Sequence, residues 1–264
     1  MSGGWPPRAG VGNVVPRTRT AGSRPAERPT LSEPPREGTL CAMTPPATGR
    51  ALLLDLGGVV LRNGRELVRG SVVEERPELA AYVRETDFAS DGDELWQAML
   101  RHQVTERAYW AQRSAEVGTA LGHDGWTTFD LIELLYDCPE SEYVNAEMVE
   151  LMVDARAAGI PVVALTNDLI DFHGQEWVDA QEWLNHFDAV VDAGLTGVLK
   201  PAPEAYAAGV AATGVPAEEV VYLDDMPVNV AGGIAAGLQT IEVRYDDRAG
   251  AVAEARRRLG LPQT

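Results

Sequence analysis

Three short apolar runs of the sequence each end in polar residues of types that can do chemistry. These polar residues are Asp55, then Thr166 with Asn167 and Asp168, then Asp224 with Asp225. Each run has the length of a strand buried on both faces of a parallel sheet. Each cluster taken singly also fits a helix cap. Because ligands bind outside the carboxyl ends of parallel strands, three such ends are expected to converge on one crevice.

Lys200 is the one lysine in the chain, whose other 21 basic residues are arginine. It lies between the second and third polar clusters, and prolines on both sides indicate a stiff loop. One interpretation is a compositional drift toward arginine that left Lys200 behind. The other is a site that needs a compact ammonium, which a planar guanidinium does not replace.

The carboxylates Asp55, Asp224 and Asp225 form a candidate metal site. Three carboxylates in one crevice repel one another unless a cation lies among them. Hard oxygen ligands suit Mg²⁺, which takes one or two protein carboxylates and fills its other positions with water and substrate phosphate. Mg²⁺ is therefore the expected cofactor.

A phosphate group fits the remaining residues of the constellation. Lys200 and Mg²⁺ together can hold a phosphate, Thr166 can donate a hydrogen bond to it, and Asn167 can orient its neighbours. Asp55 can then attack phosphorus and form an aspartyl-phosphate, a form of covalent catalysis, which water hydrolyses.

Strand and helix patterns alternate along the chain from residue 52 onward, which predicts an α/β fold with a Rossmann-like parallel sheet. The predicted strands are residues 52–54, 160–165, 188–191, 220–223 and 240–243. The predicted helices between and after them are residues 145–158, 175–187, 203–213, 228–236 and 247–259.

About a hundred residues without a strand pattern separate the first two strands. They show helical patterns over residues 75–86, 94–103, 105–117 and 127–137. Because this insert leaves the sheet just after Asp55 and returns before the second strand, we expect a helical cap above the strand ends. The expected domains are a disordered tail over residues 1–49, a core over 50–62 and 141–264, and a cap over 63–140.

The charge of the chain is uneven. Residues 1–50 carry seven arginines and three acidic residues, whereas the rest carries fifteen basic and thirty-seven acidic residues. So acidic a body repels nucleic acid and anionic membranes.

Two cysteines without paired spacing suit a reducing cytoplasm. The Pro- and Arg-rich start cannot bury enough surface to fold, and Met43 is a second candidate for the first residue.

Four segments taken in order resemble the haloacid dehalogenase-like superfamily of phosphohydrolases, in the subgroup with a helical cap. They are Leu53-Leu-Asp55-Leu-Gly57-Gly-Val-Val60, Ala164-Leu-Thr166-Asn167, Lys200-Pro-Ala-Pro-Glu-Ala-Tyr206 and Val221-Tyr-Leu-Asp224-Asp225-Met-Pro-Val-Asn229. The resemblance covers about residues 50–245.

The resemblance implies a role for each matching residue. Asp55 would be the nucleophile, Thr166 would bind the phosphoryl group with Asn167 beside it, and Lys200 would neutralise the charged oxygens. Asp225 would be the main metal ligand of its motif, and Asp224 would support the metal or its waters.

Gly57 departs from the family pattern, in which an aspartate ligates Mg²⁺ through its carbonyl and donates a proton to the leaving oxygen. Glycine keeps the carbonyl as a metal ligand and loses the proton donor, a form of catalysis worth about 10²–10⁴-fold. The insert's histidines are His102 and His123, and each is expected to be a surface or structural residue rather than a substitute donor.

Three functions follow as hypotheses. The leading one is a Mg²⁺-dependent phosphatase of a small phosphorylated metabolite. The second is a 2-haloacid dehalogenase, against which the pair Asp224 and Asp225 argues. The third is a catalytically weak binding or regulatory protein, which the glycine at position 57 favours. The identity of the substrate and the oligomeric state do not follow from the sequence.

Overall fold

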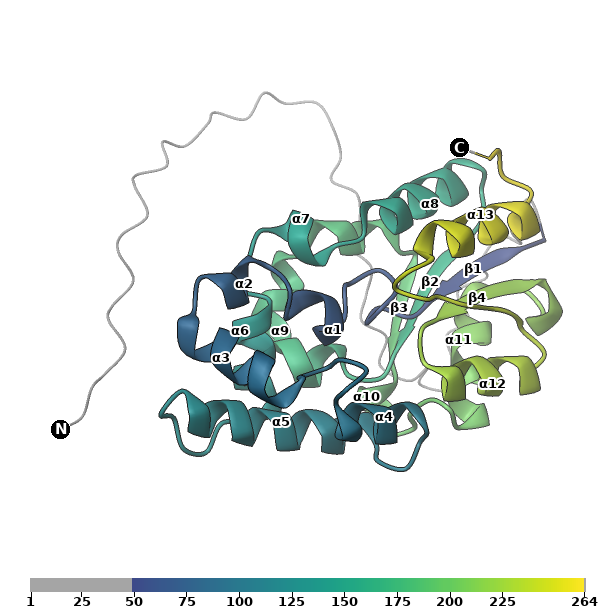
Figure 1. Ribbon diagram of the computed structural model, residues 1–264. Helices are drawn as coiled ribbons and strands as arrows, with labels where there is room; N and C mark the ends of the chain where they lie inside the picture. Colours follow the sequence, from purple (N-terminus) through teal and green to yellow (C-terminus); the bar gives the residue numbers. More distant parts are fainter. Residues whose placement is uncertain (1–48, 264) are drawn as a thin grey trace, which may run out of the picture.

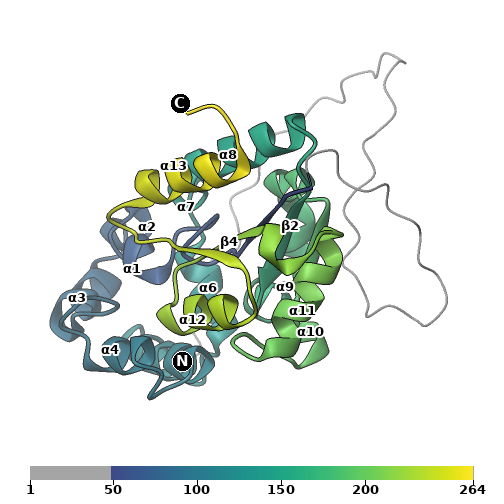
Figure 2. The same ribbon diagram turned by 90° about the vertical axis from the view of Figure 1, so that its right-hand side faces the viewer.

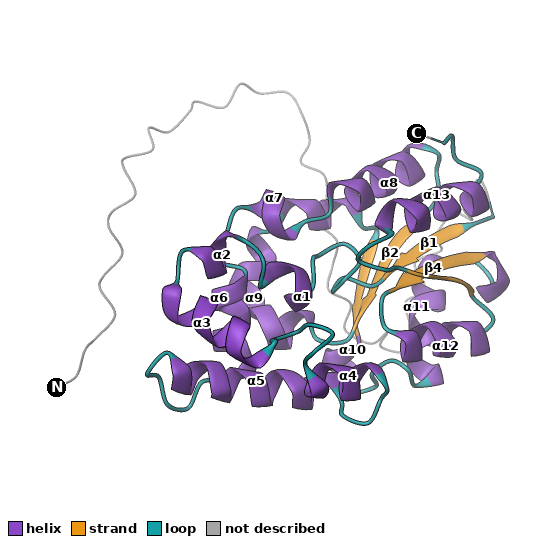
Figure 3. Cartoon of the chain, viewed as in Figure 1, coloured by secondary structure: helices purple, strands orange, loops and turns teal. Residues whose placement is uncertain are grey.

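The computed structural model describes residues 49–263 as a parallel sheet covered by helices (Figure 1, Figure 3). The predicted disordered tail, apart from residue 49, and the candidate start Met43 lie outside the described residues. The five strands run in the order β3-β2-β1-β4-β5, each parallel to its neighbours. Their bounds are Ala51–Leu54, Val162–Thr166, Ala189–Asp192, Val220–Asp224 and Gln239–Glu242 for β1 to β5. The predicted α/β fold class is therefore confirmed.

The middle strands are buried on both faces, as their unbroken apolar sequences predict. Successive side chains of β1 point to opposite faces, so Leu52 and Leu54 join one apolar cluster while Ala51 and Leu53 join another. Helices α8 (Ala146–Ala157) and α13 (Arg248–Leu259) pack together on one face of the sheet.

Helices α11 (Pro203–Thr213) and α12 (Pro227–Ala235) cover the opposite face (Figure 2). A proline begins each of these two helices at a position where the missing N–H costs no hydrogen bond. The sheet therefore lies between two helical layers, and only its strand ends are open to form a site.

Of the eight helices between β1 and β2, the seven that precede α8 lie beside the carboxyl edge of the sheet (Figure 1). They are α1 Gly64–Leu67, α2 Ser71–Glu74, α3 Pro77–Thr86, α4 Glu94–Leu100, α5 Glu106–Ala120, α6 Thr128–Leu135 and α7 Glu140–Tyr143. The four longer ones match the helices predicted in the insert. The four-residue helices α1, α2, α7 and α10 (Ala193–Thr196) were not predicted, because one helical turn leaves no periodic pattern.

The prediction of one helix over residues 175–187 is wrong. Helix α9 spans Leu169–Ala180, and a separate 3₁₀ helix, η1, follows at Glu182–His186. Gly174 has a φ of 75° inside α9, and Gln181 is extended at its end. The early start of α9 depends on Asp192, at the end of β3, which accepts a hydrogen bond of 2.9 Å from the Ile170 amide. A local pattern cannot reveal such a contact.

Among residues 49–263, no helix is both long enough and apolar enough to cross a membrane.

Candidate active site

Lys200 lies between two carboxylates at the carboxyl edge of the sheet. Its Nζ is 2.9 Å from an oxygen of Asp55 and 2.8 Å from an oxygen of Asp224. All three residues are buried. Burial lowers the pKa of Lys200, but the two carboxylates outweigh it and hold that pKa above its ordinary value. The ammonium therefore stays charged and pairs the ends of β1 and β4.

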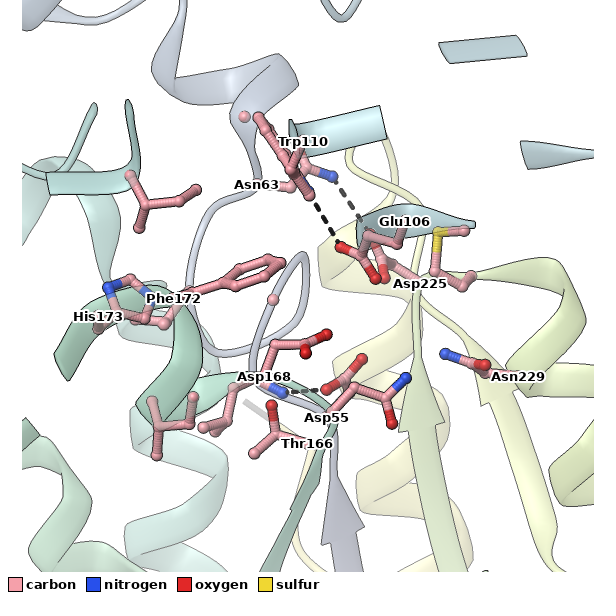
Figure 4. Close-up of a pocket in the computed structure, with 18 of the residues that line it drawn as sticks. Asp55, Asn63, Glu106, Trp110, Thr166, Asp168, Phe172, His173, Asp225 and Asn229 are labelled. Carbon is pink, nitrogen blue, oxygen red and sulfur yellow. Dashed lines mark hydrogen bonds between the residues drawn. The ribbon is translucent and has the colours of Figure 1, made fainter. Parts of the chain in front are cut away.

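The carboxylate of Asp55 follows β1, the central strand, and faces the cavity in Figure 4. Burial raises its pKa well above the ordinary value, Lys200 opposes that rise, and the carboxylates of Asp224 and Asp225 add to it. One of its oxygens accepts a hydrogen bond of 2.7 Å from the Leu56 amide, which fixes the orientation of the carboxylate.

Asp224 is fully buried and both of its oxygens are occupied. Besides Lys200, it accepts hydrogen bonds from the Tyr222 hydroxyl, the Met226 amide and the side-chain amide of Asn229. These donors satisfy a buried charge that would otherwise be costly. Asp224 is thus held as the partner of Lys200, and Asn229 is a contributor that the sequence showed only as part of a motif.

Asp225 turns toward the loop after β1. Its Oδ2 accepts a hydrogen bond of 3.2 Å from the Asn63 side chain. Burial, with the nearby carboxylates of Asp224 and Glu106, raises the pKa of Asp225 well above its ordinary value. A Cβ atom on Gly58 would lie 1.9 Å from the same oxygen, and its φ is 71°. Glycine at position 58 therefore permits this close approach.

The oxygens of Asp55, Asp224 and Asp225 lie within 4.8 Å of one another. Three carboxylates face one ammonium there, so a further positive charge would reduce the repulsion between the carboxylates. Hard oxygen donors of this kind fit Mg²⁺. Gly57, whose carbonyl was expected to ligate the metal, lines the same cavity, and a Cβ atom at that position would meet nothing within 4 Å.

Thr166 is the last residue of β2 and Asn167 follows it, so both lie at the same edge of the sheet. Thr166 is buried and lines the cavity. Asn167 accepts a hydrogen bond of 2.8 Å from the Lys200 amide and donates one of 3.2 Å to the Lys200 carbonyl. Asn167 therefore anchors the loop that carries the lysine. Asp168 forms an ion pair with Arg107 of α5, which ties this edge to the inserted helices.

All seven residues predicted for the site lie at one edge of the sheet, and all but Asp224 line the cavity there, six in number. A cavity of about 90 Å³ lies there. Its lining combines strand-end polar residues with inserted helices and α9, and includes Asp55, Gly57, Asn63, Trp96, Met99, Glu106, Trp110, Ile132, Leu135, Tyr136, Thr166, Asn167, Asp168, Phe172, His173, Lys200, Asp225 and Asn229.

Glu106 and His173 are cavity residues that the sequence did not single out. Burial, together with Asp168, raises the pKa of Glu106 to about 7, and the Trp110 indole donates a hydrogen bond of 3.3 Å to it. Burial lowers the pKa of His173 to about 3, so this imidazole is neutral. Within the described chain, the lining includes neither His102 nor His123. The one sequence feature that could have drawn attention to Glu106 is its position beside Thr105, at the start of the predicted helix that became α5.

A family model described as haloacid dehalogenase-like hydrolase matches residues 50–237. Acyl-CoA dehydrogenase family member 10 of Mus musculus is 24% identical over 217 residues, which cover 81% of this chain and 19% of that protein. The chain spans about a fifth of the length of the first curated relatives that it matches.

Two solved structures share the fold. A HAD phosphatase from Thermococcus onnurineus is 16% identical with a TM-score of 0.54, over 81% of this chain and 100% of that one. L-2-haloacid dehalogenase from Xanthobacter autotrophicus is 18% identical with a TM-score of 0.50, over 76% of this chain and 80% of that one. At these identities the likeness concerns the fold alone.

Proposed function

Because the chain belongs to the haloacid dehalogenase-like hydrolase family, we propose that it is a Mg²⁺-dependent phosphatase of small phosphomonoesters. The observation that carries the proposal is the Asp55–Lys200–Asp224 array, with Asp225 beside it. A carboxylate held open to a cavity beside a fixed ammonium and further oxygen ligands suits attack on a phosphate ester.

In the proposed reaction, an oxygen of Asp55 attacks phosphorus while the bond from phosphorus to the ester oxygen breaks. The leaving oxygen takes a proton from water, because position 57 offers no side chain. Lys200 neutralises the oxygens that gain charge, and the Thr166 hydroxyl donates a hydrogen bond to the phosphoryl group. Water then attacks phosphorus, which releases inorganic phosphate and restores Asp55.

The proposed metal ligands are Asp55, Asp225 and the carbonyl of Gly57. Asp224, with both oxygens engaged, supports the site through Lys200. A bound Mg²⁺ supplies positive charge that offsets the repulsion between the nucleophile and the phosphate dianion.

We further propose that residues 63–140 act as a cap over the cavity, with residues 50–62 and 141–264 as the core. Support comes from the lining, to which α4, α5 and α6 contribute apolar side chains opposite the strand ends. A cytoplasmic location and a small phosphorylated metabolite as substrate belong to the same proposal.

The proposal is tested on a panel of sugar, nucleotide, acyl and aryl phosphates, with Mg²⁺ and with EDTA. We expect Mg²⁺-dependent phosphate release, lowered by at least about 10³-fold in Asp55→Asn. The matched control is Asp246→Asn, which changes an exposed aspartate in a surface ion pair and should leave turnover unchanged.

Two outcomes contradict the proposal. Release of halide from a 2-haloacid that persists in EDTA would favour the dehalogenase hypothesis. Folded protein that binds Mg²⁺ and phosphate without turning over any ester would favour a binding protein.

A further inference from the structure

The cavity has two chemically different sides. The strand ends contribute the carboxylates, Lys200 and Thr166, whereas α4, α5, α6 and α9 contribute a wall of rings and aliphatic side chains. This apolar wall consists of Trp96, Met99, Trp110, Ile132, Leu135, Tyr136, Phe172 and His173. In Figure 4 the Phe172 ring points into the space above Asp55, and Trp110 lies on the far side of that space.

The rings of the wall are uncharged. His173 is neutral because burial lowers its pKa to about 3, and it stacks on Trp177 with ring centroids 4.1 Å apart. The Tyr136 hydroxyl donates to the Arg62 carbonyl, and burial raises the pKa of this phenol above its ordinary value. The wall therefore presents faces and edges of rings rather than charges.

No arginine lines the cavity, and Lys200 is its one cation, within the described part of the chain. That ammonium is already shared by Asp55 and Asp224. The one carboxyl group that the inserted helices add is Glu106, which repels anions when ionised. A second phosphate or a carboxylate on the leaving group would thus meet no counter-charge.

Few polar groups of the wall are free to bind the hydroxyls of a sugar. The Trp110 indole N–H is engaged by Glu106 and the Asn63 side-chain N–H by Asp225. The Trp96 indole nitrogen and the Asn63 Oδ1 have no hydrogen-bond partner, but both atoms are buried. Burial of hydroxyl groups against rings without hydrogen-bond partners is unfavourable. Planar apolar groups, by contrast, pack well against Phe172 and the neighbouring rings.

We propose that the leaving group of the substrate is uncharged and apolar, with an aromatic ring as its best form. This inference rests on the phosphatase function proposed above and narrows it. The phosphate occupies the strand-end side of the cavity, and the ring of the ester packs against the wall that Phe172 and Trp110 form.

Two matched substrate pairs separate recognition from leaving-group reactivity. Benzyl phosphate and glucose 6-phosphate are both esters of primary alcohols, so their difference reports the wall. Phenyl phosphate and 4-carboxyphenyl phosphate share a ring, and the carboxylate does not make the phenolate a poorer leaving group. Their difference therefore reports the added charge. We expect kcat/KM to be higher for the apolar uncharged member of each pair by about tenfold or more.

A pair of variants locates the effect on the wall. Phe172→Ala should raise KM for benzyl phosphate about tenfold, with little change for acetyl phosphate, whose leaving group is too small to fill the wall. Phe129→Ala makes the same change on α6 at a ring that is 40% exposed and outside the cavity lining, and it should alter neither KM. Thermal unfolding of both variants checks that they are folded.

The outcomes are distinct. Equal or better turnover of glucose 6-phosphate or 4-carboxyphenyl phosphate overturns the inference and leaves the phosphatase proposal standing. An unchanged KM in folded Phe172→Ala also overturns the inference. No turnover of any ester, acetyl phosphate included, overturns the phosphatase proposal and the inference with it.

Discussion

Lys200 offsets negative charge at the strand ends, because its ammonium forms ion pairs with both Asp55 and Asp224. A planar guanidinium is wider and presents its donors in a fixed fork, so arginine does not fit the space between the two carboxylates. Every other Lys or Arg position of the chain is arginine, and this geometry explains why position 200 is a lysine instead.

Replacement of this lysine should be costly. Lys200→Met leaves two buried carboxylates without their cation, and we expect it to lower the free energy of unfolding by about 3–5 kcal/mol. Urea unfolding without metal measures this. The control is Arg244→Met, which removes an exposed partner of Asp246 and should lower the free energy of unfolding far less. Equal losses in both variants would contradict the assigned role.

The glycines after Asp55 differ in what surrounds them. A side chain at Gly57 meets open space, whereas one at Gly58 collides with Asp225 at a positive φ. We expect Gly57→Asp to fold and, by placing a carboxyl group beside the proposed nucleophile, to raise kcat on alkyl phosphates by up to about 10²-fold. Gly58→Ala is the control and should reduce both stability and activity. A Gly57→Asp protein without any gain would argue against a missing proton donor.

The Glu106 carboxyl group gives a prediction of pH dependence. Its pKa is about 7 in the folded protein against an ordinary 4.5, because burial and Asp168 disfavour the charge. At pH 4.5 and below, Glu106 is protonated in both the folded and the unfolded protein, and it does not lower the free energy of unfolding. As the pH rises through about 7, the unfolded protein loses this proton more readily than the folded one, so the free energy of unfolding falls. Between pH 5 and pH 8, the metal-free protein should lose about 1–2 kcal/mol from this group.

Glu106→Gln should remove that part of the loss, as measured by urea unfolding at both pH values. Glu94→Gln, a surface change at the start of α4, is the control and should keep the dependence of the parent protein. A steeper loss in Glu106→Gln than in the parent would show that the assigned sign is wrong.

At the scale of elements, hydrophobic pattern located β1, β2, β4 and the long helices, because buried strands and helices each impose their own period. It misjudged α9, whose first turn depends on Asp192 at the end of β3. Asp192 also accepts a hydrogen bond of 3.0 Å from the Gly194 amide and so starts α10. One carboxylate thus orders two helix starts that lie apart in the sequence.

Asp192→Ala should lower the free energy of unfolding by about 2 kcal/mol, because two partly buried amides lose their acceptor. Asp192→Asn keeps one acceptor oxygen and should cost clearly less. Thermal or urea unfolding of both variants provides the measurement. Equal costs would indicate that the charge, rather than hydrogen bonding to these helix starts, is what matters.

At the scale of the whole molecule, one apolar cluster runs from the face of the sheet that α8 and α13 cover into the inserted helices. It joins residues such as Leu54 of β1 with Tyr109 of α5 and Leu131 of α6. The cavity wall and the strand ends therefore belong to one continuous core. Because of this continuity, the proposed binding of Mg²⁺ at the strand ends should change the stability of the whole protein.

Mg²⁺ should raise the unfolding temperature of metal-free protein. A ligand at 100 times its Kd stabilises the folded state by about 2.7 kcal/mol, and EDTA should reverse the gain. The shift should disappear in Asp225→Asn and persist in the surface control Asp246→Asn. A shift of equal size in Asp225→Asn would show that Mg²⁺ acts through the general negative charge of the chain.

The sequence by itself determined the family, the parallel sheet and the convergence of Asp55, Thr166, Lys200 and Asp225, since strand order and chain direction bring those ends to one edge. It did not determine which carboxylate partners which cation, nor the neutral wall formed by Phe172 and His173. Those depend on contacts between residues far apart in the chain and on burial, which shifts protonation only once the helices have packed. Tertiary structure alone therefore assigned Asp224 to Lys200, placed Glu106 in the cavity and left open space beside Gly57.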